Sequence, residues 1–240
     1  MRYNDDGIAV VWLDLDDTLI DFHTNSRRAL GRLYRTAGLD RMWSSADAWI
    51  DCYERYNQQL WAEYAAGDIS RDHLRMERFR LPLAEGGCPD GEARRLSARF
   101  DTEYLDYLAE ERELVPGALE LLEALRRAGV TVGILSNGFA EVQYRKIKRA
   151  GLEPYIDIVV LSDDIEVNKP DVRLYRHAQE RAGIADASRH MMIGDNPDTD
   201  IRGAVDAGWH AVLFDPQSKS PEVTPRVTAL AGLHALLGIR

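Results

Sequence analysis

Acidic, basic and hydroxyl side chains gather at four separate points of the chain, each at or near the end of a run of apolar residues. The four segments are residues 14–17, 136–138, 168–170 and 194–200. The first holds Asp14, Asp16 and Asp17, carboxylates that repel one another and are costly to desolvate unless a cation completes the group. Carboxylate oxygens suit Mg²⁺, whereas the amine of Lys169 and the hydroxyl of Ser136 suit phosphoryl oxygens. The segments together predict metal-assisted phosphoryl transfer.

Short runs rich in β-branched residues supply the strands that must position these groups. The runs cover residues 8–15, 130–137, 155–164, 190–196 and 210–215, and helical patterns separate the last four. Strands that alternate with helices predict an α/β fold with a Rossmann-like, doubly wound parallel sheet. The carboxyl ends of parallel strands share one edge, so the polar groups should converge there. Alternation along the first strand places Asp14 and Asp16 on the same side.

Residues 24–112 have a different texture, with helical periodicity and no strand signal. We therefore expect an α/β core of residues 1–20 and 113–240, interrupted by an all-helical domain of residues 21–112. Helices inserted after a first strand often act as lids over the ligand edge of the sheet. The aromatic stripe of this insert favours core packing over ligand binding, and the basic cluster of residues 144–149 is typical of a solvated helix C-terminus.

Composition narrows the class of protein. The 240 residues include 40 acidic and 30 basic side chains, a balance that argues against a nucleic-acid polymer as partner. No apolar stretch is long enough to span a membrane, and the N-terminal residues lack the apolar core of a signal peptide. Cys52 and Cys88 have no metal-ligand spacing, which indicates free thiols. We expect a cytoplasmic monomer or homodimer that acts on a small molecule.

The sequences DLDDT, LSNG, NKPD and GDNPDTD resemble the four motifs of the haloacid dehalogenase (HAD) superfamily, in that order. The helical insert also falls where that superfamily places its most common cap domain. The resemblance implies that Asp14 is a nucleophile that forms an aspartyl-phosphate. It implies that Asp16 is the general acid and then the base, with its backbone carbonyl on the metal. Mg²⁺ would be held by Asp14, Asp16 and Asp195.

The resemblance assigns supporting roles to further residues. Ser136, Asn137 and Lys169 would bind phosphate, and Lys169 would also take part in catalysis. Asp200 would hydrogen-bond to metal-bound water or to Lys169, and Thr18 would stabilise the turn after the first strand. Asp17 receives no catalytic role, since some members of the superfamily have glycine there.

The presence of Asp16 and Asp195 favours a phosphatase over a 2-haloacid dehalogenase, which attacks carbon and needs neither the second aspartate nor the metal. A phosphomutase keeps both aspartates, so the motifs leave this alternative open. A non-catalytic binding protein with the same fold is a further alternative.

Two stretches bear on the substrate. Asn137-Gly138-Phe139 with the following Gln143, and residues 60–79 of the insert, resemble the pyrimidine 5′-nucleotidases. The resemblance implies a pyrimidine nucleoside 5′-monophosphate, with a sugar phosphate or phosphoglycolate as the alternative. A nucleotide needs an apolar face for its base and a few hydrogen-bonding groups for its edge. The candidate specificity residues are Phe22, His23, Asn25, Arg75, Arg78 and Phe79, with Trp61 and Tyr64 as further candidates.

Overall fold

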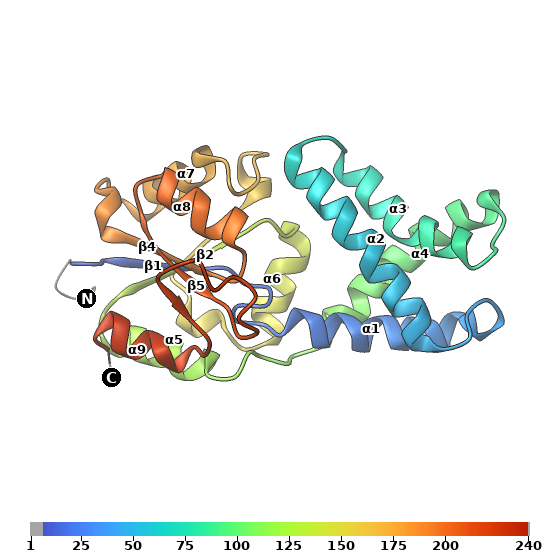
Figure 1. The fold of residues 1–240 in the computed structure, drawn as a ribbon, viewed down its shortest axis with the longest axis horizontal. Coiled ribbons are helices and arrows are strands. Elements are labelled where there is room, and N and C mark those ends of the chain that lie inside the picture. Colours follow the sequence, from blue (N-terminus) through green and yellow to red (C-terminus); the bar gives the residue numbers. More distant parts are fainter. Residues whose placement is uncertain (1–6, 240) are drawn as a thin grey trace. The chain divides into compact units, whose positions relative to one another are not determined.

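The computed structural model describes residues 7–239 and divides them into two compact units (Figure 1). The α/β core comprises residues 7–22 and 112–239, and the helical unit comprises residues 23–111.

The α/β core is built on a six-stranded sheet of β1 to β6. The strands are β1 (Val10–Leu13), β2 (Thr131–Ser136), β3 (Ile158–Leu161), β4 (His190–Gly194), β5 (His210–Phe214) and β6 (Arg226–Val227). Their order is β3-β2-β1-β4-β5-β6, and every neighbouring pair is parallel. The chain runs outward from β1 to β3 and then returns to β4 on the other side of β1. Ligands of open α/β sheets bind beyond the carboxyl ends of the strands at such a reversal, here between β1 and β4.

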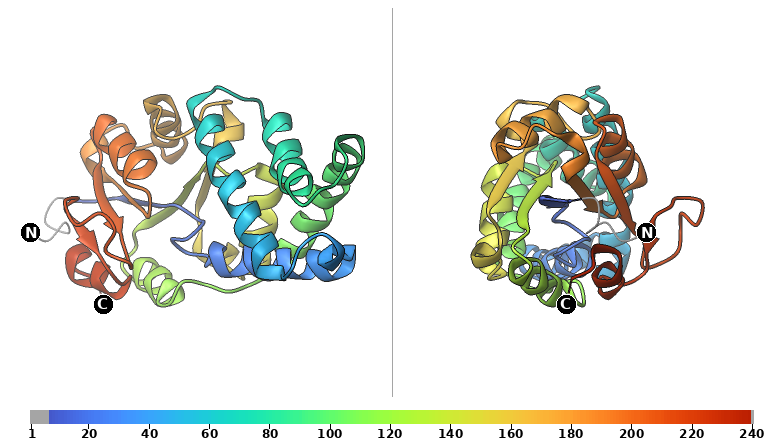
Figure 2. Two further views of the ribbon diagram at one scale, coloured as in Figure 1. Left: turned by 45° about the vertical axis from the view of Figure 1, so that its right-hand side comes forward. Right: turned by 90° about the vertical axis from the view of Figure 1, so that its left-hand side faces the viewer.

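Helices cover both faces of this sheet (Figures 1 and 2). They are α5 (Ala118–Arg127), α6 (Ala140–Arg149), α7 (Val172–Ala182), α8 (Arg202–Asp206) and α9 (Ala231–Leu237). The alternation of β1 divides the core, because Val11 and Leu13 pack with α5, α6 and α9, whereas Val10 and Trp12 pack with α7 and α8. Burial of apolar residues on both sides is typical of parallel sheets, and the predicted α/β class with a doubly wound sheet is confirmed.

A ring stack anchors β1 on one of these faces. Trp12 Nε1 donates to His190 Nδ1 at 3.0 Å, and both rings stack on Trp209. Trp12 also lies against Gly133 of β2, where a Cβ atom would come within 2.3 Å of the indole ring. The glycine therefore allows a large side chain at the centre of the sheet.

Short turns complete the core. They are the 3₁₀ turns η3 (Glu153–Tyr155), η4 (Ser162–Asp164) and η5 (Ala187–Arg189), and the π-helical turn η6 (Pro197–Ile201). The strand expected over residues 155–164 is shorter, since a 3₁₀ turn occupies each end of that run. The short β6 and α9 had no strong sequence signal and were not predicted.

The helical unit consists of four helices and one 3₁₀ turn. They are α1 (Phe22–Ala37), which begins at the last residue of the core, η2 (Leu39–Arg41), α2 (Ala46–Ala66), α3 (Arg71–Glu85) and α4 (Asp90–Leu108). Ser45 and Ser70 cap α2 and α3 by accepting from backbone N–H groups, and Gly67 ends α2 in a left-handed conformation. Helix α3 continues through Pro82 to Glu85, so only residues 86–89 separate it from α4.

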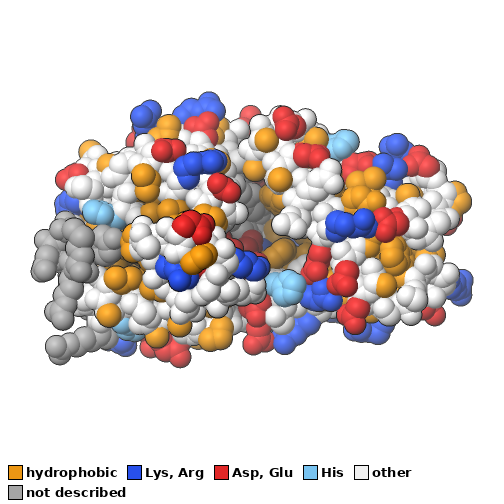
Figure 3. All heavy atoms as spheres, viewed as in Figure 1, with side chains coloured by type: hydrophobic (Ala, Val, Ile, Leu, Met, Phe, Trp, Pro, Cys, Tyr) orange, Lys and Arg blue, Asp and Glu red, His pale blue; other side chains and the backbone are white. Residues whose placement is uncertain are grey.

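On the molecular face of Figure 3, acidic and basic side chains are interspersed rather than gathered by sign. Among residues 7–239, no helix combines the length and the apolar character that a membrane span requires.

Candidate active site

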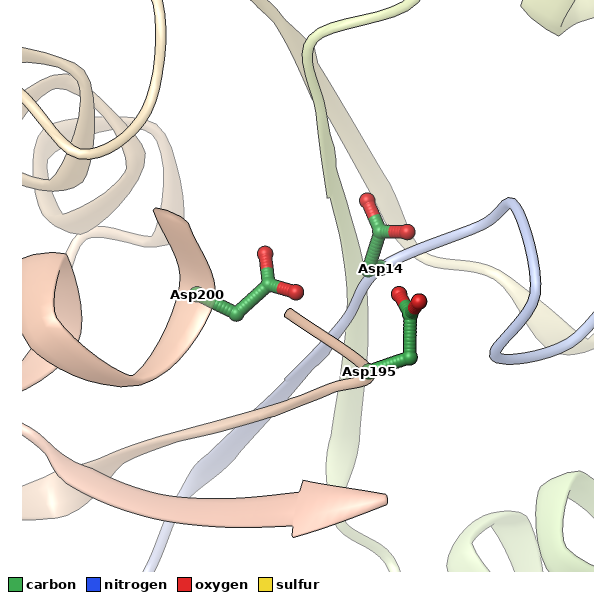
Figure 4. Close-up of side chains that lie close together, drawn as sticks. All are labelled: Asp14, Asp195 and Asp200. Atoms are coloured by element: carbon green, nitrogen blue, oxygen red, sulfur yellow. The ribbon is translucent and has the colours of Figure 1, made fainter. Parts of the chain in front are cut away.

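Three carboxylates meet at the carboxyl ends of two neighbouring strands (Figure 4). Asp14 directly follows β1, Asp195 directly follows β4, and Asp200 lies in the turn η6 that comes next. Asp14 N donates to Ile193 O at 2.9 Å, so the strand pairing holds the backbone up to the first carboxylate. One oxygen from each of the three side chains lies within 4.8 Å of the others. Such a group of oxygens could hold a metal ion.

Lys169 lies between two of these carboxylates. Its buried Nζ donates to Asp14 Oδ1 and to Asp200 Oδ1, each at 2.6 Å, and to Leu135 O at 2.9 Å. These three acceptors match the three N–H bonds of an ammonium group. The Asn137 side chain holds the Lys169 backbone, since it accepts from Lys169 N at 2.7 Å and donates to Lys169 O at 3.1 Å. Asn137, expected to bind phosphate, thus has its side chain engaged in positioning the lysine.

Asp200 is held from two directions. Lys169 takes one carboxylate oxygen, and the backbone N–H of Asn196 donates to the other at 3.0 Å. The side chain packs against Gly194, where a Cβ atom would come within 2.2 Å of Asp200 Oδ2. The last residue of β4 must therefore be small for Asp200 to reach the site.

Burial raises the pKa of two of these carboxylates, Asp14 and Asp195. Desolvation raises the pKa of Asp14 to about 7, although the charge of Lys169 opposes this rise. Desolvation, reinforced by the charges of Asp14 and Asp200, raises the pKa of Asp195 to about 8. Burial alone would lower the pKa of Lys169, but the two facing carboxylates outweigh it and the pKa is raised.

The charges of this group predict a divalent cation. Three carboxylates against one ammonium, −3 + 1, leave two negative charges unbalanced when all are ionised. The donors are all carboxylate oxygens, which Mg²⁺ prefers, so the residues present fit the metal. Asp14, Asp195 and Asp200 are the side chains that could hold it.

Asp16 takes a separate position in the turn after β1. Its carboxylate accepts from Lys146 Nζ, at 2.5 Å to Oδ1 and 2.8 Å to Oδ2, and from Gln143 Nε2 at 2.9 Å. Its side chain is thus directed to α6 and does not belong to the group of three carboxylates. The sequence analysis expected Asp16 to contact the metal through its backbone carbonyl. The carboxylate therefore remains available to pair with Lys146 and Gln143.

Lys146 is a buried partner of Asp16 that the sequence analysis placed in solvent. The cluster of residues 144–149 was expected to be solvated, and for Lys146 this was wrong, because the residue is 4% exposed and bonds to Asp16. The buried residues of α6 include Val142, Gln143 and Ile147. Lys146 falls on this same face at helical spacing, a signal that could have placed it inside.

Ser136 and Thr18 lie on either side of this network. Ser136, the last residue of β2, accepts through Oγ from Gly138 N at 3.2 Å and from Gln143 Nε2 at 2.8 Å. Thr18 is fully buried, and its Oγ1 has no hydrogen-bond partner in the described part of the chain. Backbone bonds such as Asp17 N to Ile20 O, at 2.8 Å, hold the turn instead.

The candidate specificity residues fall into two groups. Phe22 belongs to the α/β core, where its half-buried ring centroid lies 4.9 Å from Lys146 Nζ. The others belong to the helical unit, where Asn25 is buried and the exposed His23 has Nδ1 3.7 Å from Glu54 Oε1.

Arg78 and Phe79 are placed in the interior of the helical unit. The ring of Phe79 is fully buried against Tyr53 and Tyr104, with centroids 4.9 and 5.7 Å away. Arg78 is 3% exposed and pairs with Asp101. The expectation that these two side chains contact the substrate is therefore corrected. Their spacing along α3 places them in the core of the helical unit.

The other candidates of the helical unit keep some exposed surface. Arg75 pairs with the same Asp101, with Nη2 2.6 Å from its carboxylate, and remains partly exposed. Trp61 and Tyr64 meet edge to face on α2, both half-buried.

Comparison with known proteins identifies the class. The family model of haloacid dehalogenase-like hydrolases matches residues 8–208, and the chain belongs to this family. The resemblance drawn from the four motifs is confirmed at this level. The chain is thus a hydrolase whose three carboxylates occupy the expected edge of the sheet.

Individual relatives cover nearly the whole chain. The chain is 30% identical to the pyrimidine 5′-nucleotidase YjjG of Escherichia coli, over 94% of this chain and 95% of the relative. It is 32% identical to a phosphoserine phosphatase of Thermus thermophilus, over 91% and 94%. Among solved structures, the HAD-hydrolase YfnB of Bacillus subtilis, bound to magnesium, superposes with a TM-score of 0.86 at 27% identity, covering 97% of this chain and 99% of that one.

Proposed function

We propose that the chain is a Mg²⁺-dependent phosphoric monoester hydrolase that works through an aspartyl-phosphate on Asp14. The observation that carries the proposal is the grouping of Asp14 with Asp195, Asp200 and Lys169. Asp16 lies two residues after Asp14 in the chain. A dehalogenase of the same family has no use for Asp16 or for a metal, whereas phosphoryl transfer uses both.

Asp14 and Asp195, with support from Asp200 and the Asp16 backbone carbonyl, would hold Mg²⁺. When bound, the cation screens the carboxylate from the anionic phosphate and stabilises negative charge on the phosphoryl oxygens. The two unbalanced charges of the carboxylate group supply the attraction that selects a divalent ion. The magnesium reported for the YfnB structure supports this assignment.

The reaction then has two steps. A carboxylate oxygen of Asp14 attacks phosphorus, the bond from phosphorus to the ester oxygen breaks, and the leaving oxygen takes a proton from Asp16. In the second step Asp16 accepts a proton from water, whose oxygen attacks phosphorus and releases Asp14. Lys169 keeps the Asp14 oxygen in place at 2.6 Å and offsets its charge.

The phosphoryl group would be held by Ser136 and by backbone N–H groups at the start of α6, and the positive charge of the Lys169 ammonium would attract its oxygens. Asn137 contributes by fixing the Lys169 backbone through two hydrogen bonds. We further propose that the protein acts on free small molecules in the cytoplasm, as a monomer or homodimer.

The proposed substrate is a pyrimidine nucleoside 5′-monophosphate. The similarity to YjjG over nearly the full length of both chains supports this choice, as does the Asn137-Gly138-Phe139 segment followed by Gln143. Phosphoserine is the second candidate, because the Thermus relative is equally similar. Phe22 is the candidate for contact with the leaving group, since it follows the nucleophile turn within the α/β core.

A phosphate-release screen with Mg²⁺ tests the proposal. The substrates are UMP, CMP, dTMP, AMP, phosphoserine, phosphoglycolate and glucose 6-phosphate, each measured as kcat/KM. We expect the highest values for pyrimidine monophosphates, and none with EDTA. A preference for phosphoserine, phosphoglycolate or a sugar phosphate would overturn the substrate but keep the chemistry. Absence of any metal-dependent release would overturn the phosphatase and favour a binding protein.

A further inference from the structure

Helix α6 directs two buried polar side chains, Gln143 and Lys146, at the groups that the proposed reaction uses. The two residues are one helical turn apart and lie outside the four motif segments. We propose that they form a positioning pair, in which Lys146 fixes the Asp16 carboxylate and Gln143 joins Asp16 to Ser136 and orients the serine hydroxyl. The inference rests on the proposed function, because it assigns these two residues to its proton-transfer and phosphate-binding groups.

Lys146 pairs with Asp16 and does not take part in the group of Asp14, Asp195 and Asp200. Its Nζ reaches both oxygens of Asp16, at 2.5 and 2.8 Å, and its ammonium lies 4.9 Å from the ring centroid of Phe22. A lysine that is 4% exposed carries a large desolvation cost, which a single facing carboxylate offsets. The pair therefore restricts where the Asp16 side chain can lie.

Gln143 links the proton-transfer group to the phosphate-binding group. Its fully buried Nε2 donates to Asp16 Oδ2 at 2.9 Å and to Ser136 Oγ at 2.8 Å. Ser136 Oγ also accepts from Gly138 N at 3.2 Å. A hydroxyl has two acceptor sites and one donor, so these contacts occupy both acceptor sites and leave the proton to donate. An anionic phosphoryl oxygen is the acceptor that suits this proton.

The local backbone is shaped around the Gln143 amide. A Cβ atom on Gly138 would come within 2.2 Å of Gln143 Nε2 and 2.4 Å of its Cδ. The other amide atom, Gln143 Oε1, is buried without a hydrogen-bond partner in the described part of the chain. An unsatisfied acceptor lowers stability, so the amide is poorly explained as a purely stabilising contact. Its value lies in the two bonds that Nε2 donates.

The choice of leaving group separates positioning from general structural damage. An alkyl phosphate such as UMP needs a proton on its leaving oxygen, whereas 4-nitrophenolate departs readily without one. Misplacing a catalytic group by about 1 Å can cost about 100-fold in rate. Loss of Lys146 should therefore lower kcat/KM for UMP by about 100-fold and for 4-nitrophenyl phosphate by much less.

The experiment compares Lys146→Met with the matched control Lys148→Met, which removes an exposed lysine from the same helix. kcat/KM is measured for both esters with Mg²⁺, and inorganic phosphate is used as a competitive inhibitor. We expect the selective loss on UMP for Lys146→Met, partial recovery in Lys146→Arg, and wild-type values for Lys148→Met. Gln143→Leu should in addition weaken inhibition by phosphate several-fold.

Gly138→Ala gives a second route to the same test, because it displaces the Gln143 amide while Lys146 stays unchanged. We expect a larger loss on UMP than on 4-nitrophenyl phosphate, together with the weaker inhibition by phosphate expected for Gln143→Leu, even where Lys146→Met fails to fold. Equal losses on both esters, or no loss on either, would overturn the positioning pair and leave the proposed function standing. If the wild-type protein releases no phosphate from 4-nitrophenyl phosphate or from any ester of the substrate screen with Mg²⁺, the proposed function fails and the pair fails with it.

Discussion

Replacing Asp195 by asparagine should make the metal-free protein more stable at alkaline pH while abolishing its response to Mg²⁺. Asp195 shares a buried site with Asp14 and Asp200, and Lys169 pairs with the latter two there. An asparagine keeps the shape of the side chain but removes one of the two unbalanced negative charges. The substitution therefore separates the cost of the empty site from the benefit of the metal.

The sign and size follow from the raised pKa values. Burial raises the pKa of Asp14 from 3.8 to about 7 and that of Asp195 from 3.8 to about 8. Between the unfolded and the native pKa of each group, the native state keeps a proton that the unfolded chain has lost. The free energy of unfolding therefore falls as pH rises through this window. One retained proton corresponds to about 1.4 kcal/mol per pH unit. Over two pH units the asparagine variant should gain about 2–3 kcal/mol relative to wild type.

Urea unfolding in EDTA at pH 6, 7 and 8 measures this difference, and repeating it with MgCl₂ measures the metal contribution. A ligand at 100 times its Kd adds about 2.7 kcal/mol, which wild type should show and Asp195→Asn should not. Asp198→Asn is the matched control, since it removes an exposed carboxylate from the turn η6, three residues after Asp195. An Asp195→Asn variant that is less stable than wild type at pH 8 without metal, or that keeps the Mg²⁺ response, would refute the reasoning.

Four further substitutions test separate parts of the account. Asp14→Asn should lower kcat by at least about 1,000-fold without loss of folded structure by circular dichroism, because it removes the nucleophile. Gly194→Ala should displace Asp200 and cost about 1–3 kcal/mol in urea unfolding, together with weaker Mg²⁺ stabilisation. Phe79→Ala should cost about 3–5 kcal/mol with equal effects on KM for nucleotide and small esters, since its ring is buried. Phe22→Ala should raise KM for UMP more than for 4-nitrophenyl phosphate, and equal effects would remove it from the specificity residues.

The sequence was informative wherever one strand end determined the position of one side chain. Asp14 and Asp195 each follow a strand directly, and parallel pairing of β1 with β4 brings them together without further information. The same logic brings in Lys169, whose long side chain reaches the edge from the segment after β3. The α/β class could be predicted for this reason, because alternating strands and helices leave few other arrangements.

Side-chain direction within helices was the main limit. Apolar and aromatic spacing is the same for a core face and a ligand face, so Phe79 was expected at substrate although its ring packs inside the helical unit. Lys146 shows the converse, since a lysine in a basic cluster is usually solvated and only its distant partner Asp16 explains its burial. Sequence alone carries no record of a pairing across 130 residues.

Trapping the covalent intermediate tests the central claim most directly. The protein is mixed with UMP and Mg²⁺, quenched in acid within one turnover, digested and analysed by mass spectrometry. The account predicts one phosphoryl group on Asp14, absent in EDTA and absent in Asp14→Asn. Hydrolysis of UMP with no phosphoryl group on Asp14, or with the group on another residue, would contradict it.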